Sequence, residues 1–104
     1  MVIYEVNLSI NNDIFQEYYE WLLPHIQQML LFNGFIKSEI GMVENNEDDN
    51  QNHLRVSYTV DSYDNLQHYF DHHASEMRAE AINRFGDKIN VTRRIILEPL
   101  TLCA

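Results

Sequence analysis

The chain has 104 residues, of which 45% are hydrophobic and 22% charged, and its formal net charge at pH 7 is −9. Two independent cores would each be too small to be stable at this length, so we expect residues 1–104 to form one globular domain. Phosphate backbones and anionic lipid surfaces require clustered Lys and Arg side chains, and no basic run here is longer than Arg93-Arg94. We therefore expect neither nucleic acid nor a membrane surface as a partner.

Other features of the sequence are typical of a cytoplasmic protein. The first residues, Met1 to Glu5, lack the basic segment and the apolar stretch of a signal peptide. No apolar run approaches the roughly 20 residues that span a bilayer. The lone Cys103 has no second cysteine with which to form an internal disulfide, which fits a reducing compartment. We therefore expect a cytoplasmic location.

The first half of the chain predicts a strand, a helix and a second strand. Apolar residues alternate with others over residues 2–10, which is the period of a strand with one buried face. Residues 14–32 then place their apolar side chains on one broad stripe of a helix that contains Pro24 and ends at Gly34. Residues 35–43 form the next predicted strand. Its apolar face is expected to carry Ile36, Ile40 and Met42.

The second half predicts a loop, a strand, a helical region and a last strand. Residues 44–52 carry four acids and no apolar residue and predict a mobile hairpin loop, after which residues 54–60 alternate as a strand. A helical region follows the N-cap Ser62, and after a break near His73 we expect Ser75 to cap a second helix. Residues 89–97 predict the fourth strand. Its apolar face is interrupted by Arg93.

The order of elements is thus β-α-β-β-α-β, which predicts an α+β, ferredoxin-like fold. Four antiparallel strands form one sheet in this fold, and both helical regions pack on one of its faces. The other face is polar, and we expect Glu5 and Arg55 to pair across it. It lacks the stacking aromatic residues of an RNA-recognition module. A solvated face and a dimer interface both remain open for this surface.

Several short motifs of the chain also occur in a known family. They are Val2-Ile3-Tyr4-Glu5-Val6, Trp21-Leu22 with His25-Ile26, Val56-Ser57-Tyr58, Tyr69-Phe70 with His73-Ala74-Ser75-Glu76-Met77-Arg78, and Arg84-Phe85-Gly86. Over nearly all of its length the chain resembles the DUF4286 family of small bacterial proteins. Gln27, Ser57 and Ser75 stand where that family has Pro, Gln and Pro.

The resemblance implies a dimeric α/β barrel, so we expect a homodimer. The wider barrel group includes cofactor-free oxygenases, haem-degrading enzymes and isomerases, alongside proteins that only bind ligands. A reaction taken from that group would rest on the fold alone. The resemblance therefore implies fold and dimerisation and assigns no activity and no cofactor.

Five side chains on predicted inward faces form the candidate ligand pocket. They are Trp21, His25, Tyr58, His73 and Arg78. A His can act as a general base or orient a ligand, and an Arg can bind an anionic group, so an acidic or aromatic small molecule is the expected ligand. Structural roles are the alternative: His25 as a hydrogen-bonded core residue, His73 filling the helix break, and Arg78 paired with a carboxylate.

Two further groups of side chains contain residue types that can bind metal ions. Asp64, His68 and His72 are spaced four residues apart on the polar face of a helix, where two His can chelate zinc or nickel. That face is solvated and no cysteine completes a closed site, so we expect no metal there. The acidic loop lacks the Gly and the spaced carboxylates of a calcium loop.

We favour a homodimer that is non-catalytic or binds a small ligand. The alternative is a cofactor-independent oxygenase or isomerase that acts on a small aromatic or acidic metabolite, with His25, His73 and Arg78 as its candidate catalytic residues. A cavity of a few hundred Å³ between sheet and helices, with these polar tips converging on it, would favour the enzyme. A third hypothesis is an interaction module that uses the acidic loop.

Overall fold

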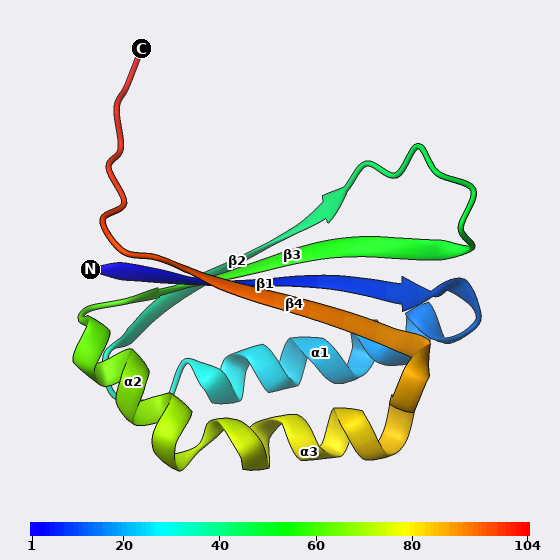
Figure 1. The fold of residues 1–104 in the computed structure, drawn as a ribbon, viewed down its shortest axis with the longest axis horizontal. Helices are drawn as coiled ribbons and strands as arrows, with labels where there is room; N and C mark the ends of the chain where they lie inside the picture. The colour runs from blue at the N-terminus through cyan, green and yellow to red at the C-terminus, as the bar shows by residue number, and fades with distance from the viewer.

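The computed structural model describes all 104 residues, arranged as four strands, three helices and two short 3₁₀ turns (Figure 1). The strands are β1 (Val2–Asn11), β2 (Phe35–Val43), β3 (Gln51–Val60) and β4 (Ile89–Ile96). The helices are α1 (Phe15–Met29), α2 (Tyr63–His72) and α3 (Ala74–Phe85). The 3₁₀ turns are η1 (Asn12–Ile14), which precedes α1, and η2 (Gly86–Lys88), which precedes β4.

The strands form one antiparallel sheet in the order β2-β3-β1-β4. All three helices lie on the same side of this sheet, and the chain after β4 leaves on the other side (Figure 1). The predicted ferredoxin-like arrangement is therefore confirmed. None of the helices combines the length and the hydropathy of a membrane-spanning segment.

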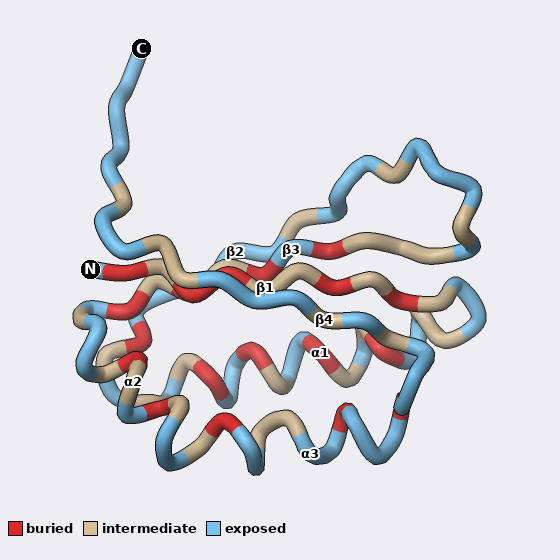
Figure 2. The backbone as a smooth tube through the Cα atoms, viewed as in Figure 1, coloured by how far each residue is buried: buried red, intermediate tan, exposed pale blue.

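The hydrophobic core lies between the sheet and the helices, where the buried residues gather (Figure 2). Alternate residues of β1 and β3 point toward the helices because side chains of a strand alternate between its faces. The apolar stripe of α1 packs against them through Tyr18, Leu22, Ile26 and Met29. The chain buries 19 of its 104 residues, so the core is one thin layer.

Aromatic rings fill the middle of this layer around Tyr4 of β1. The ring of Tyr4 stacks on that of Tyr58 at a centroid distance of 5.8 Å and meets Phe70 edge-on at 5.1 Å. Tyr69 packs beside it at 6.2 Å. These contacts attach α2 to the two central strands, β1 and β3.

Two local predictions were wrong. Ser75 lies inside the first turn of α3, and His73 holds the N-cap position without a side-chain cap. In β2 the pairing with β3 shifts between Phe35 and Lys37, so the face toward the helices carries Phe35, Ile40 and Met42, and Ile36 is 55% exposed. A β-bulge inserts one extra residue into the strand. Residues before and after it, which would share a face by simple alternation, therefore point to opposite faces.

The predicted pair of Glu5 with Arg55 was also wrong. Glu5 accepts a hydrogen bond from Nε of Arg94 on β4 at 2.6 Å, and the strand register places Asn7, not Glu5, opposite Arg55. The hydrogen bond from Arg94, followed by that from Asn7, lowers the pKa of Glu5 below its ordinary value. Neighbouring side chains leave Glu5 only 4% exposed on the otherwise polar face.

The hairpin loop between β2 and β3 is held to the sheet by side-chain hydrogen bonds. Asn45 donates to Asp49 at 2.8 Å, and Asp49 contacts Nε2 of His53 at 3.1 Å. The other ring nitrogen of His53 lies 3.0 Å from the hydroxyl of Ser9 on β1. The loop predicted from its acidity therefore has a defined connection to the central strand.

We expect the turn at Gly34 to be sensitive to substitution. Gly34 has a φ of +85°, and a Cβ there would lie 2.5 Å from Oδ1 of Asp61 and 2.7 Å from Cβ of Asn65. Gly34→Ala should lower the free energy of unfolding by about 1–3 kcal/mol in urea denaturation, because both the backbone and the neighbours resist the methyl group. Gly41→Ala is the matched control, since no atom lies within 4 Å of its Cβ position. Equal losses in the two variants would contradict this interpretation.

Candidate functional site

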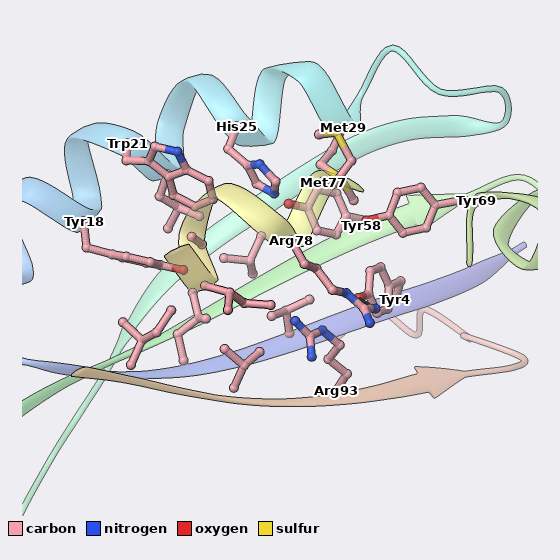
Figure 3. A pocket seen from close by; sticks show the side chains of 18 residues that line it. Tyr4, Tyr18, Trp21, His25, Met29, Tyr58, Tyr69, Met77, Arg78 and Arg93 are labelled. Atoms are coloured by element: carbon pink, nitrogen blue, oxygen red, sulfur yellow. Dashed lines mark hydrogen bonds between the residues drawn. The ribbon is translucent and has the colours of Figure 1, made fainter. Parts of the chain in front are cut away.

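A cavity lies between the sheet and the helices α1 and α3 (Figure 3). Its volume is about 80 Å³, and 15 of its 18 lining residues are hydrophobic. Strands β1, β3 and β4 form its floor, and α1 and α3 form its walls. This volume holds several water molecules, but it is smaller than the roughly 150 Å³ of a closed cavity known to bind benzene. The cavity of a few hundred Å³ expected for an enzyme is therefore not present at this position.

Four of the five predicted pocket residues line this cavity: Trp21, His25, Tyr58 and Arg78. Trp21 and His25 are one turn apart on α1, and their rings stack at a centroid distance of 4.5 Å. Tyr58 reaches the cavity from β3 and Arg78 from α3 (Figure 3). Helical spacing and strand alternation thus bring together residues that are far apart in the sequence.

The fifth predicted residue, His73, lies elsewhere. Its ring stacks on Phe32 at 4.5 Å, and the two residues line a separate hollow with His68. The backbone breaks between α2 and α3 at this residue, which has a φ of −129°. His73 is half-buried at this break and does not line the cavity with the other four residues.

Sequence reasoning missed other polar groups of the cavity, among them Tyr4, Tyr69 and Arg93. Arg93 pairs with Val6 across β1 and β4, which places it on the helix side of the sheet. The sequence did contain one signal for Arg93: it interrupts the apolar alternation of β4, so it lies at a position where a buried side chain is expected. Tyr4 and Tyr69 gave no signal, because a Tyr at an inward position has the same pattern as any core aromatic residue.

The tyrosine hydroxyls at the cavity are neutral hydrogen-bonding groups. Burial raises the pKa of Tyr18 and of Tyr69 to about 12. Burial also raises the pKa of Tyr58 well above its ordinary value, and the neighbouring Tyr69 raises it further. The Tyr4 hydroxyl accepts a hydrogen bond from an Nη of Arg78 at 3.1 Å. The hydroxyls of Tyr18, Tyr58 and Tyr69 therefore remain protonated at neutral pH and can orient a ligand.

His25 is the titratable imidazole of the cavity. Burial lowers its pKa below the ordinary value of 6.5, and the charge of nearby Glu80 acts in the opposite direction. The ring is therefore neutral at pH 7 and can accept a proton or a hydrogen bond. A neutral imidazole against apolar walls suits either a ligand contact or a general base.

The structure contains no group of three or more His, Cys, Asp or Glu side chains placed to hold a metal ion. The rings of His68 and His72 lie 4.2 Å apart between centroids, as their spacing predicts, but Asp64 does not complete a three-ligand group with them. The chemistry available at the cavity is thus that of neutral hydroxyls, one neutral imidazole and two guanidinium groups.

The depressed pKa of His25 predicts a pH-dependent stability. The unfolded chain binds a proton at His25 more readily than the folded chain does, so the free energy of unfolding should decrease as the pH falls below 6.5. Urea denaturation between pH 7.5 and 5 should show this decrease, and His25→Gln should remove part of it. The NMR titration of the His25 ring should give a midpoint below 6.5. A midpoint above that value would contradict the assigned burial.

Solved structures with the same fold differ from the chain in sequence. A dimeric ferredoxin-like protein from an uncultured marine organism has a TM-score of 0.74 at 12% identity, with all of both chains covered. A candidate antibiotic biosynthesis monooxygenase from Deinococcus radiodurans has a TM-score of 0.68 at 15% identity, again with both chains fully covered. A variant of SnoaB, a cofactor-independent oxygenase from Streptomyces nogalater, has a TM-score of 0.64 at 13% identity over 97% of this chain and 96% of its own.

These likenesses show the fold alone, since every identity is below 25%. No curated protein matches the chain in sequence. The model of one family, described as a domain of unknown function (DUF4286), matches residues 1–99, and the chain belongs to that family.

Proposed function

We propose that the protein is a homodimer that binds a small, largely apolar molecule between its sheet and its helices, in a reducing compartment such as the cytoplasm. The observation that carries this proposal is an unfilled cavity in an otherwise thin core. Side chains of a core pack at the density of organic crystals, so a void loses contacts that a ligand can restore. Apolar walls with a few polar tips are the usual lining of a small-molecule site.

The space available to a ligand extends beyond the inner cavity. An outer hollow of about 340 Å³ shares Tyr4, Arg78 and Arg93 with it. A ligand of ring size can therefore place one part against the apolar walls and another in the outer hollow. The outer hollow and the inner cavity together exceed the roughly 300 Å³ at which ordinary ligand sites begin.

Binding can be tested with benzyl alcohol as a neutral aromatic probe. We expect it to change the amide NMR signals around the cavity and the fluorescence of Trp21, the only tryptophan. Ala81→Leu fills the cavity from α3 and should weaken binding by about tenfold or more, which corresponds to about 1.4 kcal/mol. Ala79→Leu is the matched control, because Ala79 lies on the exposed side of the same helix.

Circular dichroism of both variants checks that they fold, since a larger side chain can strain a packed core. Equal weakening in Ala81→Leu and Ala79→Leu, or signal changes that lie outside the cavity, would contradict the proposal. Absence of any change at millimolar probe would contradict it too.

The polar face of the sheet supports the proposed dimer. It lies opposite the helices, and the segment 97–104 leaves the sheet on this side (Figure 1). Leu97, Leu100 and Leu102 of that segment are 60%, 81% and 83% exposed. A second copy packed on this face would cover these leucines and bury further surface on the side of the sheet away from the core. The dimeric description of the marine ferredoxin-like protein agrees with such an assembly.

We expect Thr59→Lys to break the dimer. Thr59 points from β3, a central strand, toward the polar face opposite Ile3 and Lys37, where a new charge with no carboxylate across from it would be buried in the interface. The dissociation constant of the dimer should rise by at least about 30-fold, which corresponds to a loss of about 2 kcal/mol or more in the free energy of association. Gln28→Lys on the exposed side of α1 is the control. Light scattering should give twice 12.4 kDa for the wild type and the control. A monomeric wild type at every concentration would disprove the dimer.

A cofactor-independent oxygenase or isomerase is the second candidate, and His25 is the observation that favours it. A neutral imidazole stacked on Trp21 inside an apolar cavity is suited to remove a proton from an aromatic substrate. The names of the two oxygenase-like structures point in the same direction. Oxygen uptake with a phenolic probe that His25→Gln abolishes would favour this enzyme, and binding without turnover would favour the ligand-binding protein.

A further inference from the structure

We propose that Arg78 and Arg93 together bind the carboxylate group of the molecule held in the cavity. This inference rests on the proposed ligand binding and adds the chemical class of the ligand: a small acid with an apolar or aromatic body. The inference is supported by the local charge, by a hydrogen-bond donor of Arg78 that has no partner, and by the shape of the space next to the two arginines.

The two arginines carry positive charges that no carboxylate of the chain neutralises. The chain carries 16 acidic residues against seven basic ones, so carboxylate partners are abundant. The side chains of Lys37, Lys88, Arg84 and Arg94 each pair with one of them. Of the other three basic residues, Arg55 lies on the polar face of the sheet, whereas Arg78 and Arg93 face the same cavity, and none of the three has a carboxylate partner. Two unneutralised guanidinium groups at one site repel each other, and an anion between them removes that repulsion.

Arg78 has a hydrogen-bond donor without a partner. The Nε atom of Arg78 is buried and has no hydrogen-bond partner, while one Nη donates to the hydroxyl of Tyr4. Buried donors are nearly always paired in folded proteins, so an unpaired one marks a place for a missing acceptor. A guanidinium presents its donors as a planar fork that matches the two oxygens of a carboxylate.

The two arginines lie where the inner cavity meets the outer hollow. Arg78 comes from α3 and Arg93 from β4, and their guanidinium groups lie on the Tyr4 side of the cavity (Figure 3). Both arginines also line the outer hollow, so they stand between it and the apolar interior. An acid can therefore keep its charged end at the arginines and extend part of its apolar body toward Tyr58 and Trp21, in an inner cavity that is smaller than a whole aromatic ring needs. Arg94, also at the outer hollow, is already engaged by Glu5.

Benzoate and benzamide test this inference, because they have nearly the same shape and differ in charge. We expect benzoate to bind at least tenfold more tightly than benzamide by NMR titration, with signal changes around Trp21 and Ala81. Arg93→Gln should remove this preference, because it should lower the affinity for benzoate far more than the affinity for benzamide. Arg84→Gln, which alters an exposed arginine of α3 paired with Glu17, should leave both affinities unchanged. Added salt should weaken only the binding of benzoate.

Arg78→Gln and Arg78→Lys add a second test, with circular dichroism to check folding. The Gln variant should lose the preference, and the Lys variant should keep only part of it, since an ammonium group has no planar fork. If benzamide binds as tightly as benzoate, or if Arg93→Gln keeps the preference, the carboxylate site is overturned and the proposed ligand binding stands. If neither probe changes the cavity signals, both proposals fail.

Discussion

The packing of Tyr4 between the sheet and the helices is the contact on which the rest of the structure depends. Its ring stacks on Tyr58 of the neighbouring strand, and Phe70 of α2 meets it edge-on. Its hydroxyl accepts a hydrogen bond from Arg78 of α3. One side chain therefore joins two strands to two helices. It also lies on the boundary between the inner cavity and the outer hollow, so the fold and the candidate site share this contact.

The helices cover only one face of the sheet. The helix side contains the cavity, with its tyrosine hydroxyls and two arginines that have no carboxylate partner. The opposite side is polar, carries the Glu5–Arg94 pair and is where the chain after β4 departs. The ligand binding and the dimerisation that we propose would thus use different faces of the same sheet. Arg94 connects the two, because it lines the outer hollow and donates to Glu5 on the polar face.

The order of elements and the inward direction of four cavity residues could be predicted, because both follow from local periodicity. Alternation with a period of two placed Tyr58 on the helix side, and helical spacing placed Trp21 and His25 on one stripe of α1. The errors occur where a local break resets the pattern. The bulge at the start of β2 moved Ile36 outward. The break between α2 and α3 moved His73 away from the cavity and against Phe32.

By itself the sequence determined the four strands, the helical regions and the choice of buried face, since each depends on residues a few positions apart. The order of the strands followed from the predicted fold, whereas the tertiary structure alone decided their register. That is why Glu5 pairs with Arg94 and not with Arg55. It also decided that Arg78 and Arg93 share one cavity, because the distance between two elements depends on how the whole core packs. Periodicity predicts which side of an element is buried, and packing decides what meets there.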